Sequence, residues 1–161
     1  MVLYHNDFTT GLQGLTLIKD FEGLELDAYL CPSNVPTIGY GHTKDVCMGD
    51  TIEYETAVEL LKHDLCEFEN IVKDCVTTQL NQNQFDALVS FTFNLGGHNL
   101  SRSTLLKRVN ARLFSEVQKE FMKWVYSNGS VLVGLQRRRY AEAKLFHKPV
   151  GQLSDDMGRY R

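Results

Sequence analysis

Three side chains that could take part in chemistry lie close together near the start of this 161-residue chain. Glu22 comes at the end of an apolar run, Cys31 follows nine positions later, and Thr37 follows six positions after Cys31. A carboxyl group that a neighbouring lobe partly buries tends to keep its proton and can act as a general acid. A polar hairpin opposite it could hold a water molecule. Glycoside hydrolysis with inversion needs such an acid and such a water on opposite sides of the bond.

Two N-terminal elements must position these residues. Four apolar residues recur at helical spacing and predict a first helix that ends near Gly23: Leu12, Leu15, Ile18 and Phe21. Residues 27–43 mix β-branched and aromatic residues with Pro, Asn and Gly, which predicts a hairpin or a small sheet. Pro32 and Pro36 keep this sheet short. Glu22 is therefore expected at a helix end, with Cys31 and Thr37 on the hairpin.

A long helix should follow the hairpin. Thr51 is the predicted N-cap, and Glu53 and Glu55 lie near the positive end of the helix dipole. The apolar residues then step by threes and fours through Tyr54, Val58, Leu61, Leu65, Phe68, Val72 and Val76. A helix of about 24 residues is about 36 Å long. It could therefore connect two lobes.

The rest of the chain is predicted to be helical. "NQNQFDALVSFTFNLGG" should end at its Gly-Gly pair, and "STLLKRVN" should be a short helix. Ser115 is the predicted cap of "EVQKEFMKWVYSNG", which Gly129 should end, and "GLQRRRYAEAKLF" should stop before Pro149. The polar residues 151–161 are expected to be loosely held.

These elements predict an α+β fold that is mainly helical and has two lobes within a single domain, 1–161. Residues 1–60 form the N-terminal lobe with a small antiparallel sheet, about 52–76 form the connecting helix, and 77–161 form the helical C-terminal lobe. A cleft between two such lobes is a natural ligand site.

Composition and charge narrow the class of protein. A hydrophobic fraction of 43% with 23% charged residues is ordinary for a soluble globular protein. No apolar run reaches the roughly 18 residues of a membrane span, and residues 1–10 do not resemble a secretion signal, so a cytosolic protein is expected. Residues 1–80 hold 4 Lys and Arg against 14 Asp and Glu, whereas residues 81–161 hold 13 against 6. The basic half could meet a polyanion, or the two halves could simply be solvated surfaces.

The cysteine pattern gives no sign of a disulfide framework or a metal site. The four cysteines are at positions 31, 47, 66 and 75, without a CxxC pair. Cys66 and Cys75 should turn to opposite faces of one helix, so we expect reduced thiols. A zinc site with His42, His63 and His98 lacks the usual ligand spacing, and we expect no metal or other cofactor.

The segment "FEGLELDAYLCPSNVPTIGYGHT" closely resembles the signature of the phage-type lysozymes, family twenty-four of the glycoside hydrolases, which includes endolysins. That signature is Glu, eight residues, Asp or Cys, five residues, Thr, and then Ile-Gly-x-Gly-His. Glu22, Cys31 and Thr37 meet both spacings. "FNLGGHNLSRSTLLKRVN" and "GLQRRRYAEAKLF" are similar to C-terminal motifs of the family, so the resemblance covers roughly residues 12–148.

The resemblance implies a role for each matching residue. Glu22 would be the general acid, Cys31 would occupy the second catalytic position, and Thr37 would help to hold the water. Arg138 would lie near Glu22 and hold it in place, and Asn94 would face the cleft and hydrogen-bond the substrate. His42 would pair with an acid on the long helix: the candidates, in order, are Asp64 and Glu67.

The implied substrate is the peptidoglycan glycan strand, cut between N-acetylmuramic acid and N-acetylglucosamine. The enzyme would be a monomer that binds no nucleic acid and waits in the host cytosol until a holin-type pore releases it. Two enzymatic alternatives are a lytic transglycosylase and a wall peptidase with Cys31 as nucleophile and His42 as base. A non-catalytic wall-binding module is a third. Because Glu22 and the acidic lobe lie near Cys31, we expect like charges to raise the pKa of its thiol.

Overall fold

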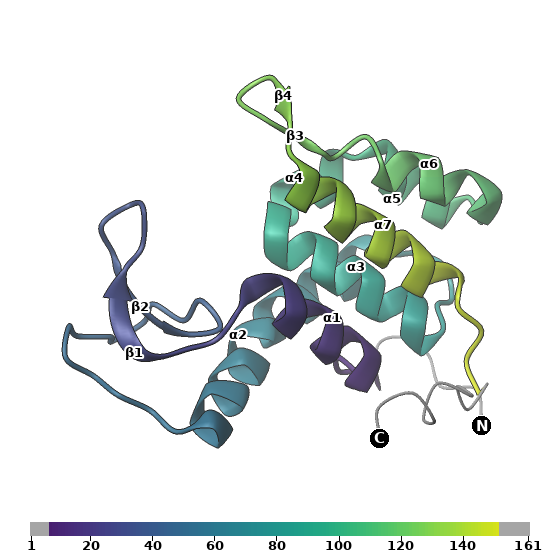
Figure 1. The fold of residues 1–161 in the computed structure, drawn as a ribbon. Helices are drawn as coiled ribbons and strands as arrows, with labels where there is room; N and C mark the ends of the chain where they lie inside the picture. The colour runs from purple at the N-terminus through teal and green to yellow at the C-terminus, as the bar shows by residue number, and fades with distance from the viewer. Residues whose placement is uncertain (1–6, 152–161) are drawn as a thin grey trace, which may run out of the picture.

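The fold comes from a computed structural model, which describes residues 7–151. The elements, shown in Figure 1, are in chain order α1 (Leu12–Glu22), β1 (Glu25–Leu30), β2 (Pro36–Gly39), α2 (Tyr54–Cys75), α3 (Gln82–Leu95), α4 (Gly97–Arg102), α5 (Thr104–Asn110), the 3₁₀ helix η2 (Phe114–Glu116), α6 (Val117–Phe121), β3 (Tyr126–Ser127), β4 (Ser130–Val131) and α7 (Val133–His147). The predicted α+β class, mainly helical with a small antiparallel sheet, is confirmed.

The first helix ends where the sequence predicts. Glu22 is the last residue of α1, and the backbone amide of Gly23 donates to the Lys19 carbonyl at 3.1 Å. Gly23 has a φ of 74°, a conformation that residues with a Cβ rarely adopt. The chain therefore leaves the helix directly after Glu22 and continues into β1.

The predicted hairpin is present as the antiparallel pair of β1 and β2, with Tyr29 opposite Thr37. Its turn is closed by the Cys31 amide, which donates to the Val35 carbonyl at 3.1 Å. Asn34 takes a left-handed conformation in this turn, with a φ of 63°. The turn brings Cys31 and Thr37 to the same end of the hairpin.

The long helix is confirmed, but its predicted cap is wrong. α2 has 22 residues, which corresponds to about 33 Å. Its N-cap is Glu53, without a side-chain cap, and not Thr51. Thr51 instead forms an isolated bridge with Asp27, and its hydroxyl donates to the Asp27 carboxylate at 2.8 Å. The Thr51 hydroxyl thus binds Asp27 on the hairpin and does not cap α2.

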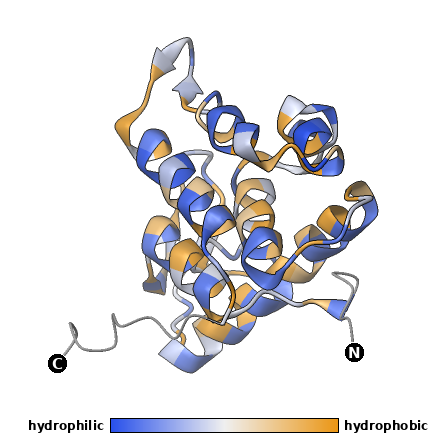
Figure 2. Cartoon of the chain, turned by 90° about the vertical axis from the view of Figure 1, so that its right-hand side faces the viewer, coloured by the Kyte–Doolittle hydropathy of each residue, from blue (hydrophilic) through white to orange (hydrophobic). Residues whose placement is uncertain are grey.

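α3 is the centre of the helical part. An Asn81–Gln84 capping box starts it, and nine of its residues are buried, including Asp86 and Ser90. It packs against α7, α2 and α1. Figure 2 shows hydrophobic and hydrophilic residues alternating along the helices, as expected of helices with one buried face. The core of the molecule lies between these helices.

The long helix predicted after Ser115 is not present. Ser115 lies within η2, α6 ends at Phe121, and residues 126–131 form a β-hairpin instead. Asn128 and Gly129 both have positive φ in its turn, at 50° and 79°. An Asn-Gly pair favours such a two-residue hairpin turn, so Gly129 is a turn residue and not a helix stop. Residues 152–161, most of the predicted loose tail, lie outside the described residues.

α1 packs on the helices of the C-terminal part, against α3 and α7. Its N-terminus has no cap of its own, and Asp86 of α3 accepts hydrogen bonds from the Gly11 and Gly14 amides at 3.0 and 3.1 Å. A Cβ at position 14 would lie 2.7 Å from the Asp86 Cβ, so glycine permits this close approach. Thr10 donates from its amide and its hydroxyl to Glu69 of α2. The start of α1 is thus tied to α3 directly and to α2 through the residue Thr10 that precedes it.

Three further findings concern residues 7–151. None of the helices there is long and apolar enough to cross a membrane. No group of three or more His, Cys, Asp or Glu side chains in that range is arranged to hold a metal ion. The four cysteines are free, and Cys66 and Cys75 lie on α2 as expected.

Candidate active site

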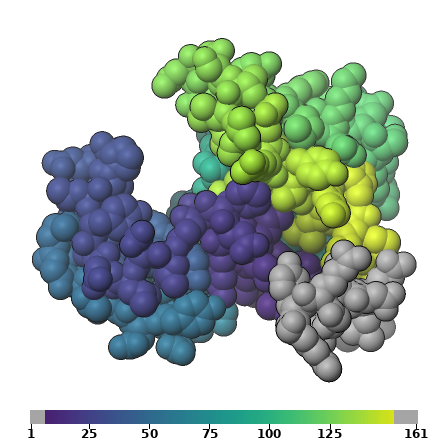
Figure 3. All heavy atoms as spheres, in the orientation of Figure 1, coloured from purple at the N-terminus to yellow at the C-terminus, as the bar shows by residue number. Residues whose placement is uncertain are grey.

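A cavity of about 700 Å³ lies beside Glu22. The end of α1, the loop after β2, one face of α2 and the end of α3 form its walls, with the lining residues Glu22, Tyr40, Gly41, His42, Thr43, Lys44, His63, Asp64, Cys66, Glu67, Phe68, Phe93 and Asn94. Figure 3 shows the molecule notched between the β1–β2 hairpin, in blue, and the β3–β4 hairpin, in green. Four of the predicted site residues, Glu22, His42, Asp64 and Asn94, therefore face one cavity.

Glu22 is held by the arginine that the resemblance implied. Nη1 of Arg138 donates to Oε1 of Glu22 at 2.5 Å. The Arg138 side chain is 4% exposed, whereas that of Glu22 is 24% exposed. The guanidinium also lies 5.8 Å from the centre of the Phe21 ring, close enough for a cation–π contact. A buried cation thus fixes a carboxyl group that can still reach the cavity.

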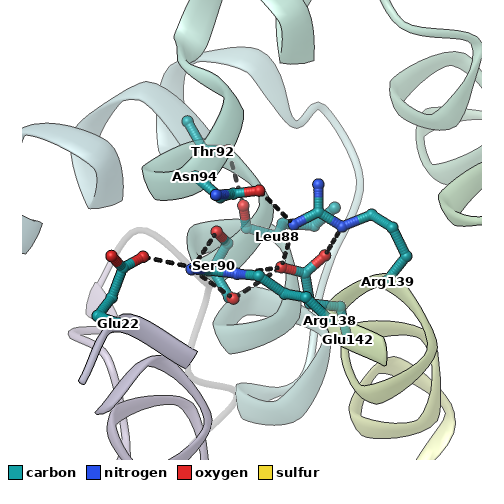
Figure 4. A network of polar contacts seen from close by, with 8 residues as sticks. All are labelled: Glu22, Leu88, Ser90, Thr92, Asn94, Arg138, Arg139 and Glu142. Carbon is teal, nitrogen blue, oxygen red and sulfur yellow. Dashed lines mark hydrogen bonds and ion pairs between the residues drawn. The ribbon is translucent and has the colours of Figure 1, made fainter. Parts of the chain in front are cut away.

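Three further polar residues continue this contact into the core. Glu142 is fully buried and accepts hydrogen bonds from Ser90 and from both Arg138 and Arg139 (Figure 4). Burial raises the pKa of the Glu142 carboxyl, and the two guanidinium groups oppose that rise. Burial likewise lowers the pKa of Arg139, against the effect of Glu142. Since all of these partners donate to Glu142, the arrangement suits the carboxylate form.

Asn94 lines the cavity at the end of α3, as predicted. Nη2 of Arg139 donates to its side-chain oxygen at 2.8 Å. With the oxygen engaged, the amide nitrogen is the group that Asn94 offers to a ligand. In Figure 4 this nitrogen is turned away from Arg139.

Cys31 and Thr37 lie together on the hairpin and do not line the 700 Å³ cavity. The Thr37 side chain is buried, and its hydroxyl donates to the Val35 carbonyl at 2.9 Å. The expected rise in the pKa of the Cys31 thiol is wrong. That pKa is lowered, mainly by hydrogen bonding with the Val35 backbone and further by the Ser33 backbone and the Thr37 hydroxyl. No acidic group is among the causes of the shift, so the like charges that we expected to dominate do not.

His42 pairs with Asp64, the first of its two candidates. Nδ1 of His42 lies 2.8 Å from Oδ2 of Asp64 and 3.0 Å from Oδ1. The ring is 10% exposed, so most of this contact is shielded from solvent. Glu67, the second candidate, lines the same cavity one turn further along α2. The pair ties the loop after β2 to the middle of α2.

Sequence reasoning missed the buried residues behind the cavity wall. Ser90, Arg139 and Glu142 did not stand out, although Glu142 follows the two arginines at helical spacings of three and four. That spacing could have indicated the ion pairs. The burial of Glu142 could not have been predicted, because charged residues are rarely buried fully.

Comparisons with known proteins show what the whole chain is similar to. A family model described as phage lysozyme matches residues 19–142. The chain is 41% identical over 138 residues to an endolysin of Acyrthosiphon pisum secondary endosymbiont phage 1, covering 83% of this chain and 94% of that protein. It is 44% identical over 136 residues to the endolysin of Bacillus phage B103, but covers only 52% of its length, so it spans about half of that relative. A solved muramidase domain of SpmX from Asticaccaulis excentricus is 41% identical and superposes with a TM-score of 0.82, covering 88% of this chain and 99% of that domain.

Proposed function

The chain belongs to the phage lysozyme family, and from that membership we propose that it hydrolyses the β-1,4 bond between N-acetylmuramic acid and N-acetylglucosamine, with Glu22 as the general acid. It is an endolysin-type enzyme whose substrate is peptidoglycan. The observation that carries the assignment of Glu22 is its position at the cavity, held by a buried arginine.

Glu22 would protonate the glycosidic oxygen as the bond breaks. A general acid must be held within hydrogen-bond reach of the leaving oxygen, and the contact with Arg138 restricts the carboxyl group to one orientation. After the proton has left, the guanidinium stabilises the carboxylate that remains. The Asn94 amide, on another wall of the same cavity, would donate to a carbonyl or hydroxyl oxygen of the sugar.

Cys31 and Thr37 would act on the water that attacks the anomeric carbon. Their shared end of the hairpin supports this proposal, as does the lowered pKa of the Cys31 thiol, which leaves more of the sulfur as thiolate, able to accept a proton, than in an ordinary cysteine. A water activated on the face opposite Glu22 would give inversion. The same lowered pKa favours one alternative, in which the Cys31 sulfur attacks the sugar itself and the product keeps its configuration.

Analysis of the products of purified peptidoglycan tests the reaction. Mass spectrometry should find new reducing sugar ends; anhydro-muramic ends would instead indicate a transglycosylase, and new amines a peptidase. Early NMR spectra of the product anomer separate inversion from retention. Glu22→Gln, which cannot donate an acidic proton, should fold normally and lose at least about a hundredfold in rate. Near-native activity of a folded Glu22→Gln protein would reject the assignment.

Release through a holin-type pore stays a prediction. Bacteria that express the protein should remain intact until chloroform or a pore opens the inner membrane, and prompt lysis without such treatment would contradict it.

A further inference from the structure

Glu142 does not line the cavity, yet its carboxylate joins the two arginines that reach the cavity wall. Oε1 accepts hydrogen bonds from Ser90 Oγ at 2.8 Å, from Arg139 Nη2 at 2.9 Å and from Arg138 Nε at 3.3 Å (Figure 4). Oε2 lies 2.7 Å from Arg139 Nε. The side chain is fully buried, so solvent does not compete for these contacts. One carboxylate therefore orients both guanidinium groups.

The two arginines lead to two different groups of the proposed site. Arg138 reaches Glu22 through Nη1, and Arg139 reaches the Asn94 side-chain oxygen through Nη2. Both end points line the same cavity. A change at Glu142 would thus alter the position of Glu22 through Arg138 and that of the Asn94 amide through Arg139.

Charge links Glu142 to Glu22 as well. The network contains two guanidinium cations, Arg138 and Arg139, and two carboxyl groups, Glu22 and Glu142. A general acid must hold its proton, whereas an adjacent guanidinium favours the carboxylate. Because Glu142 offsets part of the positive charge, it limits that effect on Glu22.

Other charged groups also surround Glu22, but they lie on other walls or along its own helix. Those that line the cavity are His42, Lys44, His63, Asp64 and Glu67. Lys19 and Asp20 precede Glu22 on α1. None of them is among the partners of Arg138 in the described structure, so a change at Glu142 would act on Glu22 separately from them.

Given the proposed function, on which this step rests, we propose that Glu142 is a positioning residue that balances the charge of Arg138 beside Glu22 and fixes the Asn94 amide through Arg139. It touches no substrate.

The test is Glu142→Gln, which keeps the size of the side chain and an acceptor for Ser90 but removes the charge. Rates are measured from pH 4 to 9 on soluble, un-cross-linked glycan strands. Activity requires protonated Glu22, so it falls on the alkaline side; an uncompensated Arg138 should move that alkaline limb down by about one pH unit. Loosening of Asn94 should raise KM about threefold. Glu120→Gln is the matched control, because Glu120 of α6 is nearly buried but pairs with Lys123 and does not line the cavity, and it should change neither value.

A second variant separates the two branches. Arg139→Met with Glu142→Gln removes one positive and one negative charge, which restores the balance around Arg138. The alkaline limb should return to its wild-type position, while KM stays raised because Asn94 has lost Arg139. Circular dichroism and thermal unfolding establish which variants are folded.

The proposal is overturned if Glu142→Gln folds and keeps both the wild-type KM and the wild-type alkaline limb of the pH–rate profile. It is also overturned if the alkaline limb of the double variant stays displaced. If only the double variant folds, a wild-type limb with raised KM supports the proposal. If neither folds, Glu142 serves the fold and the positioning role is rejected. A wild-type enzyme that releases no reducing ends would reject the proposed function instead.

Discussion

Arg138 and Glu22 lie 116 positions apart in the sequence, and their side chains form an ion pair 2.5 Å long. The pair joins the last residue of α1 to the middle of α7. The same guanidinium also reaches the carbonyl and the hydroxyl of Ser90, at 3.3 and 3.4 Å. Each of its nitrogens thus has a partner on a different element, which a smaller cation could not reproduce.

The first prediction concerns this guanidinium. Arg138→Lys keeps the charge but cannot meet Glu22, Ser90 and Glu142 together. We expect a loss of about 3 kcal/mol in the free energy of unfolding, as for other broken buried pairs, and a fall in kcat of at least about tenfold from the freed acid. Urea unfolding and initial rates measure the two effects. Arg137→Lys, at the exposed neighbouring position on α7, is the control and should change neither. Wild-type kcat in Arg138→Lys would show that the ion pair does not orient Glu22.

The second prediction concerns His42 and Asp64. A double-mutant cycle with His42→Gln and Asp64→Asn should give a coupling energy of about 1 kcal/mol near pH 6, because the contact is short and the ring is mostly buried. The exposed pair of Arg108 and Glu116 provides the comparison and should couple by no more than about 0.5 kcal/mol. Equal coupling energies for the two pairs would contradict the argument from burial.

The third prediction concerns Cys31. Because its thiol has a lowered pKa while burial raises that of Cys75, iodoacetamide should modify Cys31 at lower pH than Cys75. Peptide mapping by mass spectrometry follows each cysteine separately. If Cys31 and Cys75 were modified over the same pH range, Cys31 would lack the lowered pKa on which its proposed role as a base rests.

Substitutions at Cys31 test its use in the reaction. Cys31→Asp should keep much of the activity, Cys31→Ser should keep some, and Cys31→Ala should lose most, because only the first supplies a carboxylate base and only the first two can hydrogen-bond a water. A trapped glycosyl adduct on Cys31 would show instead that the sulfur is a nucleophile.

The fourth prediction concerns Asp86, which accepts hydrogen bonds from Gly11, Gly14 and Gln82. Asp86→Asn replaces one acceptor oxygen by a donor and should cost about 1–3 kcal/mol of unfolding free energy. Burial raises the folded pKa of Asp86. Its pH-dependent contribution is therefore fully present below the unfolded pKa of about 3.9 and is lost as pH rises through the folded value. The difference between the two proteins should shrink between pH 4 and pH 7, as urea unfolding at both values can measure; a difference that grows with pH would contradict this sign.

The sequence predicted the elements that local patterns control. Gly23 ends α1 because glycine there can take positive φ, and the apolar period of α2 is long enough to identify it. Errors arose where a distant partner or a turn decided the outcome. Thr51 bonds Asp27 on the hairpin instead of capping α2, and Asn128 with Gly129 turns the chain into a hairpin where apolar spacing alone indicated a helix.

The candidate site likewise contains residues that the sequence predicted and residues that it could not predict. The family motif placed Glu22, His42 and Asn94 in one cavity, and it identified Arg138 as the neighbour of Glu22. The partners of Arg138 inside the core could not be predicted, since the contact between Ser90 and Glu142 joins residues 52 positions apart. The lowered pKa of the Cys31 thiol depends on the backbone around it, which the residue types do not specify.

α1 packs against α3 and α7, which are synthesised after it. The site can therefore assemble only late in synthesis. A ribosome completes Glu22 early, and the growing chain has to wait for α7 before Arg138 can meet it. Closing a contact over such a sequence separation is entropically costly and slow compared with forming a local helix. A polypeptide stopped before Val133 would carry the acid without the cation that orients it. Translation itself would then time the first appearance of a competent acid.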